Sequence, residues 1–82
     1  KNHELGHYVW NLYMNDKQRK NYTKLYNRAI TQGTGSFYRE YWMIDREEDF
    51  SENFALMIMK EKIKVPQLQY RINYIRTIFK TL

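Results

Sequence analysis

The sequence predicts an all-α chain of about four helices, and three observations lead to this prediction. Apolar residues recur at helical spacing in four segments that are separated by short breaks. Aromatic residues make up 17% of the chain and proline occurs once, which suits a well-packed helical domain. Hydrophobic residues make up 43%, which is too many for a disordered tail. We therefore expect residues 1–82 to belong to a single domain.

The first predicted helix is under way at His3 and runs to about Met14. Asn15 and Asp16 form the expected break, and the side chain of Asp16 is expected to cap the following helix. Five apolar residues at helical spacing form the face that we expect to be buried. They are Leu5, Tyr8, Val9, Leu12 and Tyr13.

The second predicted helix runs from about Lys17 to Gln32, and Gly33 suits its C-terminal stop. Its apolar residues lie on one face. They are Tyr22, Leu25, Tyr26, Ala29 and Ile30. Residues 33–44 are expected to form a loop, with a short extended piece around Phe37 to Trp42.

The third predicted helix starts near Asp45 and continues to about Lys62. Its stretch from Phe54 to Met59 is apolar on all sides, which predicts burial. Pro66 suits the first turn of a fourth helix. The apolar stripe of that helix is formed by Leu68, Ile72, Ile75 and Phe79.

The net charge of +5 comes from one end of the chain. Residues 60–82 carry six basic residues against Glu61, whereas residues 1–59 are neutral overall. The bases of the second helix mostly lie opposite its apolar face, and no aromatic-basic RNA signature is present. We therefore expect no nucleic-acid partner. No apolar run approaches the roughly 20 residues that span a bilayer, so no membrane span is expected either.

The segment His3-Glu4-Leu5-Gly6-His7 has the pattern H-E-x-x-H. Residues four apart on a helix differ by only about 40° in direction, so both imidazoles can reach one zinc ion. Glu4 lies on the flank of that face, where its carboxylate can take a proton from a water that attacks a peptide carbonyl. The pattern therefore predicts a zinc-dependent endopeptidase.

A catalytic zinc needs a third protein ligand. The chain has only two histidines and no cysteine, so this ligand must be Asp or Glu. An acidic segment provides the candidates, which are Glu47, Glu48, Asp49 and Glu52.

Glu48 and Glu52 share one face of the third helix, where two like charges repel unless a cation is near. Glu48 has a second interpretation that is local. It lies three residues after Asp45, so it could reach back to the Asp45 amide as half of a capping arrangement.

The combined spacing resembles the metallopeptidase domain of anthrax lethal factor and of the related Pro-Pro endopeptidases. The matching residues are His3-Glu4-Leu5-Gly6-His7, Tyr41, Glu48 and Glu52. Phe50 and Phe54 provide the aromatic surroundings of the last glutamate, and the region from Pro66 to the end looks like the closing helix of lethal factor. The resemblance covers nearly the whole chain.

The resemblance implies a role for each matching residue. His3, His7 and Glu48 would bind Zn²⁺, with Glu4 as general base and acid. The hydroxyl of Tyr41 would face the developing oxyanion, with Tyr38 as the competing candidate. Glu52 would accept a hydrogen bond from a ligand histidine. Asp49 and Ser51 depart from the family, which prefers an aromatic residue and alanine there, and this leaves Glu47 open as the ligand.

The resemblance also implies what surrounds the chain. Residues 1–82 would be the helical C-terminal portion of a zincin-like metallopeptidase domain whose sheet lies upstream, and this piece alone would be a doubtful catalyst. The substrate would be an extended protein segment, proline-containing by analogy with the family. The protein would be secreted by a bacterium or delivered into host cells as a toxin domain. The alternative is a non-catalytic binding or regulatory copy of the same toxin domain.

Overall fold

The computed structural model describes residues 2–37 and 45–79, and it confirms the all-α prediction. Within these two ranges there are four α-helices, one π-helical turn, one 3-10 turn and no strand. The elements are α1 (Asn2–Tyr8), the π-helix η1 (Val9–Tyr13), α2 (Asp16–Gln32), the 3-10 turn η2 (Thr34–Ser36), α3 (Arg46–Ile58) and α4 (Pro66–Ile78). None of the helices described here is long and apolar enough to cross a membrane.

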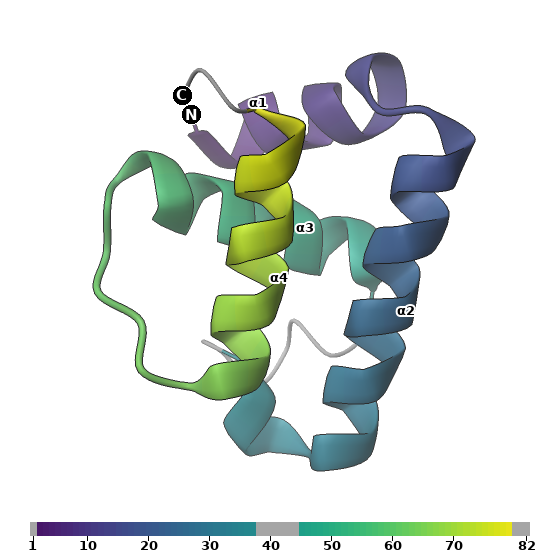
Figure 1. Cartoon of the computed structure of the whole chain (residues 1–82). Helices are drawn as coiled ribbons and strands as arrows, with labels where there is room; N and C mark the ends of the chain where they lie inside the picture. Colours follow the sequence, from purple (N-terminus) through teal and green to yellow (C-terminus); the bar gives the residue numbers. More distant parts are fainter. Residues whose placement is uncertain (1, 38–44, 80–82) are drawn as a thin grey trace.

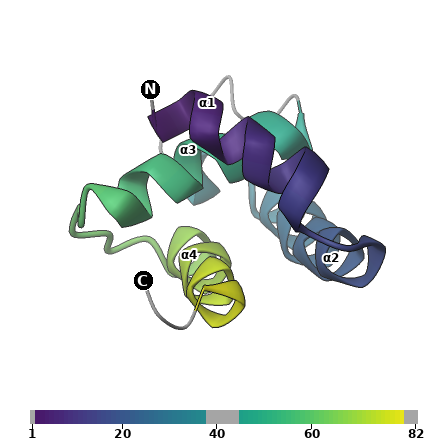
Figure 2. The same cartoon turned by 90° about the horizontal axis from the view of Figure 1, so that it is seen from above.

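The helices form two antiparallel pairs that cross each other (Figure 1). Helices α2 and α4 lie side by side, and α1 lies along α3 across them, as the view from above shows (Figure 2). Three rings meet where the pairs cross. Trp10 and Tyr22 lie 5.8 Å apart between ring centroids, and each lies 5.2 Å from Phe50. This aromatic centre joins η1, α2 and α3.

Helix α2 agrees with the prediction in its length and in its buried face. Tyr22, Tyr26 and Ala29 are buried, and Gly33 ends the helix with a φ of 90°, a conformation that glycine adopts without strain. The predicted cap was wrong by one residue. Asn15, not Asp16, accepts the hydrogen bond from the Gln18 amide, and the Gln18 side chain bonds the Asn15 amide in return.

The predicted buried face of the first helix was wrong except for Val9, which is buried. Leu5, Tyr8, Leu12 and Tyr13 are exposed, and the residues buried beside Val9 are Gly6, Trp10 and Met14. The sequence offers two overlapping apolar faces, and the glycine decides between them because α1 packs on α3 through the side that lacks a Cβ atom. The change to π-helical hydrogen bonding at Val9, with the Met14 amide bonded to the Val9 carbonyl, also departs from the assumed α-helical period.

Helix α3 begins as predicted, with Asp45 as its N-cap, but it ends at Ile58 and not near Lys62. The Lys60 amide bonds the Met57 carbonyl, and the Glu61 amide bonds the Leu56 carbonyl. This pair of bonds is a Schellman motif, in which the residue after the cap takes a left-handed conformation. Lys60 has a φ of 57° in that position. Glycine is the usual residue there, so the sequence contained no stop signal.

Helix α4 starts at Pro66 as predicted, and Leu68, Ile72 and Ile75 are buried. Phe79 follows the helix and is only partly buried. Its ring stacks on that of Tyr13. Phe37 is buried, with the Arg71 guanidinium 4.6 Å from the centre of its ring. The rest of the predicted extended piece, Tyr38 to Trp42, lies outside the described residues.

A buried polar network fixes α3 against α2 and α4. Asp49 of α3 forms an ion pair with Arg71 of α4, with Nε 2.8 Å from Oδ2, and both side chains are completely buried. The Tyr22 hydroxyl of α2 donates to the same oxygen at 2.6 Å, and Asn53 donates to it at 3.2 Å. Arg71 also donates to the backbone carbonyl of Ser36. One carboxylate thus connects three helices, and it is the neighbour of Glu48 in the chain.

Candidate metal centre

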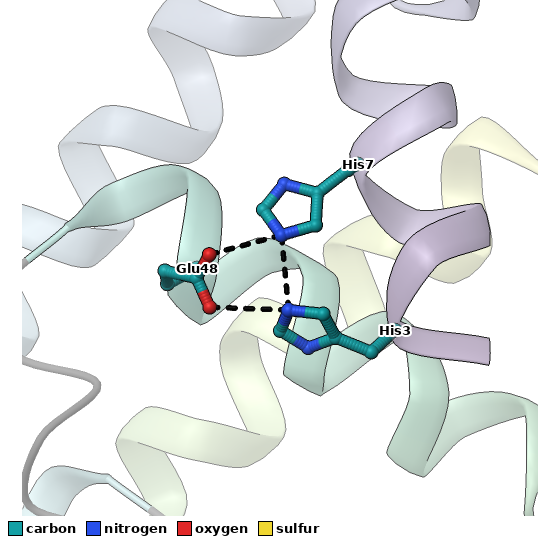
Figure 3. A group of neighbouring side chains, drawn as sticks. All are labelled: His3, His7 and Glu48. Atoms are coloured by element: carbon teal, nitrogen blue, oxygen red, sulfur yellow. Dashed lines mark hydrogen bonds and ion pairs between the residues drawn. The ribbon is translucent and has the colours of Figure 1, made fainter. Parts of the chain in front are cut away.

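Three side chains converge between α1 and α3 (Figure 3). His3 and His7 project from one face of α1, and their Nε2 atoms lie 2.9 Å apart. Glu48 of α3 places Oε1 3.1 Å from Nε2 of His3 and Oε2 2.9 Å from Nε2 of His7. The two helices are antiparallel, so the contacts move back along α3 as the chain advances along α1: His3 contacts Glu52 and Glu48, and His7 contacts Glu48 and Glu47. This group could hold one metal ion, because each residue directs a ligand atom to the same point.

Gly6 allows α1 to come this close to α3. A Cβ atom at position 6 would lie 2.6 Å from Cα and 2.9 Å from the carbonyl oxygen of Ser51. Both atoms belong to the backbone, so no rotamer change could move them away. Ser51 itself is small and completely buried. The glycine between the two histidines and the serine after Glu48 therefore set the distance across which the three side chains meet.

Replacing Gly6 by alanine is expected to destabilise the protein. Alanine favours a helix over glycine by about 1 kcal/mol, but overpacking a tight contact costs about 1–3 kcal/mol. The overlap is with backbone, so we place the cost at the upper end and expect the free energy of unfolding to fall by up to about 2 kcal/mol. Denaturant unfolding of the purified variant measures this change.

Gly35 provides the matched control, because a Cβ atom there meets nothing within 4 Å. Gly35→Ala should leave stability unchanged or raise it slightly. Ser51→Gly should not rescue Gly6→Ala, since the two shortest contacts are to the Ser51 backbone. A Gly6→Ala variant as stable as the parent would contradict the close approach of α1 and α3.

The outer nitrogen of each imidazole faces a further carboxylate of α3. Nδ1 of His3 contacts Oε1 of Glu52. Nδ1 of His7 lies 2.7 Å from Oε2 of Glu47. Glu47 therefore does not direct its carboxylate to the point where the Nε2 atoms meet. Of the glutamates that the sequence left open as ligands, Glu48 alone contacts both Nε2 atoms in the part of the chain described here.

This arrangement favours a cation at the centre. An imidazole that donates its Nδ1 proton to a carboxylate presents a lone pair at Nε2 when it is neutral. The lone pairs of two neutral imidazoles at this point and the carboxylate of Glu48 would repel one another unless a proton or a metal ion lay among them. The side chains of His3 and His7 are each 30% exposed, so an ion at this point would remain accessible to solvent.

The pKa of His7 reflects the same surroundings. Partial burial by itself would lower it, but the hydrogen bond to Glu47 and the negative charges of Glu48 and Glu47 outweigh this effect. The pKa of His7 is therefore raised above its usual value of 6.5. Without a metal, a proton is held between these carboxylates more firmly than on a free histidine.

The other predicted site residues have different outcomes. Glu4 is exposed on α1, next to the histidines in the chain but outside the converging group. Asp49 was a candidate ligand, and this candidate is excluded by its burial in the ion pair with Arg71. Burial raises the pKa of Asp49, against the opposing effects of Arg71 and its hydrogen-bond donors. Tyr41 and the competing Tyr38 lie outside the described residues.

The structure places the side chain of Glu48 at the two histidines and not at the cap of α3. Asp45 caps α3 through its own side chain, which accepts a hydrogen bond from the Glu47 amide at 2.8 Å. The carboxylate of Glu48 faces the two histidines.

Sequence reasoning missed the contact between Glu47 and His7 and the part that Asn11 has in it. The amide of Asn11 donates to Oε2 of Glu47 and to the His7 carbonyl, both at 2.9 Å. Asn11 lies four residues after His7, so its place on the same face of the helix was a signal that could have been used. Its partner on α3 could not be found from spacing alone.

Comparisons with protein-family models, with curated proteins and with solved structures find no match to this chain.

Proposed function

We propose that this chain carries the zinc site of an endopeptidase. The proposal rests on one observation, namely that the two histidines of an H-E-x-x-H segment meet Glu48 of a distant helix at one point. Histidine nitrogens and a carboxylate oxygen are ligands that zinc prefers, and two His and one Glu form a known catalytic set. The resemblance to the lethal factor-type metallopeptidases supports the same function.

The distances fit such an ion. Zinc binds nitrogen at about 2.0–2.1 Å and carboxylate oxygen at about 2.0–2.2 Å, which places neighbouring tetrahedral ligand atoms about 3.3 Å apart. The two Nε2 atoms lie 2.9 Å apart, and each lies 2.9 or 3.1 Å from one of the two oxygens of Glu48, so only a small separation would admit the ion. Their Nδ1 partners would keep both imidazoles in the metal-binding tautomer.

Bound zinc would polarise a peptide carbonyl and favour ionisation of a water. Glu4 follows His3 directly and is exposed, so its carboxylate is free to accept a proton from the attacking water and to pass it to the leaving amine. Tyr41 is proposed, from the resemblance alone, to donate to the oxyanion. The substrate is proposed to be an extended protein segment that contains proline, and the protein to act outside the bacterial cell or in a host cell.

A zinc titration of the complete protein tests the proposal. We expect about one equivalent to bind, and we expect affinity to fall sharply in His3→Ala and in Glu48→Ala, because each removes a ligand. Competition with a chromophoric chelator measures the affinity. Glu61→Ala is the matched control, since Glu61 is an exposed acid in the loop after α3. Complete protein that takes up no zinc would overturn the proposal.

The same titration should depend on pH in a definite direction. Zinc binds only the neutral imidazole, so protons compete for His7. The pKa of His7 is raised, so this competition begins at a higher pH than for a free histidine. Affinity should therefore fall as the pH is lowered from about 8 to about 5.5, with the decline beginning above 6.5. A constant affinity across this range would exclude His7 as a ligand.

A further inference from the structure

We propose that Glu47 is a positioning residue of the metal centre. Its carboxylate holds the imidazole of His7 and is itself held by a hydrogen bond from Asn11. This inference rests on the proposed zinc site and adds residues that the resemblance does not include. Glu47 is linked to His7 from outside the converging group, through the nitrogen that faces away from His3 and Glu48. It would therefore act on a metal only through His7.

The contacts of Glu47 form a closed set. Its Oε2 atom lies 2.7 Å from Nδ1 of His7 and accepts a hydrogen bond from Asn11 at 2.9 Å. The same Asn11 amide group donates to the His7 carbonyl at 2.9 Å. Asn11 therefore links the carboxylate to the backbone of the residue whose ring that carboxylate orients. Three contacts thus restrain the side chains of Asn11, Glu47 and His7, which reduces the conformational freedom that metal binding would otherwise have to remove.

Glu47 also completes a symmetrical arrangement. His3 has Glu52 at its outer nitrogen, and His7 has Glu47. A carboxylate at the outer nitrogen of a ligand histidine fixes the tautomer and raises the basicity of the ligand nitrogen. With Glu48 between them, three glutamates of one helix serve two histidines of another. The simpler interpretation is that Glu47 stabilises α3 only through the interaction of its negative charge with the helix dipole, since it lies in the first turn of the helix.

The experiment compares Glu47→Ala, Glu47→Gln and Asn11→Ala with the control Glu61→Ala. Zinc affinity of the complete protein should fall about 10–100-fold in Glu47→Ala. It should fall less in Glu47→Gln, because the amide oxygen still accepts from Nδ1, and also less in Asn11→Ala, because the carboxylate remains. Denaturant unfolding of each metal-free variant reports any effect of the helix dipole separately.

The tautomer of His7 provides a readout that needs no metal. Long-range ¹H–¹⁵N NMR of the zinc-free protein, above the pKa of His7, should show a larger share of the Nδ1-protonated tautomer in the parent than in Glu47→Ala. Without Glu47, the carboxylate of Glu48 at Nε2 remains to accept the ring proton. An unchanged tautomer together with unchanged zinc affinity would overturn the role of Glu47 and leave the proposed function standing. Absence of zinc binding in the parent would instead refute the proposed function, while the tautomer would still decide whether Glu47 holds His7.

Discussion

Replacing Glu4 by glutamine is expected to slow the proposed peptide hydrolysis by the complete protein about 10²–10⁴-fold while zinc binding stays unchanged. Glutamine keeps the shape of the side chain but cannot take a proton, and loss of a general base typically costs about 10²–10⁴ in rate. Zinc should still bind because Glu4 is not among the three residues that converge. The measurement is kcat/KM on an unfolded, proline-containing polypeptide, with zinc content determined on the same samples.

The control for Glu4→Gln is Glu61→Gln, which changes an exposed acid far from α1 in the sequence and should retain full activity. Three results are informative. Retained hydrolysis in Glu4→Gln would exclude Glu4 as the base. Loss of zinc would make Glu4 a ligand. Zinc binding by the parent without hydrolysis of any extended polypeptide would favour the non-catalytic copy of the toxin domain.

Replacing Asp49 by asparagine is expected to have the largest effect on stability. The change leaves the Arg71 guanidinium charged and buried without its counter-ion, and breaking a buried pair in this way typically costs about 3–5 kcal/mol. A small domain has about 5–15 kcal/mol of stability in total, so much of it would be lost. Denaturant unfolding measures the loss directly.

Two comparisons test whether the ion pair is the cause. Arg71→Met should also be strongly destabilising, and the double variant should cost clearly less than the two single changes together, because neither charge is then left alone. Asp16→Asn breaks an ion pair with Arg19 on the surface, where Asp16 is fully exposed, and should have little effect. Equal small effects for Asp49→Asn and Asp16→Asn would contradict the buried network.

The buried network also explains why an acidic segment of the sequence could not be sorted by spacing alone. Glu47, Glu48 and Asp49 are consecutive, so they point in directions about 100° apart around α3. The carboxylate of Glu47 contacts the outer nitrogen of His7, that of Glu48 contacts both histidines, and that of Asp49 lies in the core. Which residue takes which role depends on the rotation of α3, and that rotation is set by contacts with α2 and α4.

The first helix shows the opposite case, in which a clear local pattern misled. Leu5, Tyr8 and Leu12 have the spacing of a buried stripe, yet they are exposed. The packing of Gly6 against Ser51 brings α1 close on another side. A hydrophobic pattern shows which residues could be buried. Which of them are buried depends on the shape of the helix that packs against them.

Sequence alone determined the features that depend on neighbours within one helix. It predicted four helices, the pairing of His3 with His7 on one face, and the pairing of Glu48 with Glu52 on another, because positions along a helix follow from its 3.6-residue turn. The tertiary structure decided how the two faces meet across 40 residues of chain. That meeting depends on the rotation and separation of α1 and α3, which Gly6, Ser51 and the Asp49–Arg71 pair set through contacts that no local pattern records.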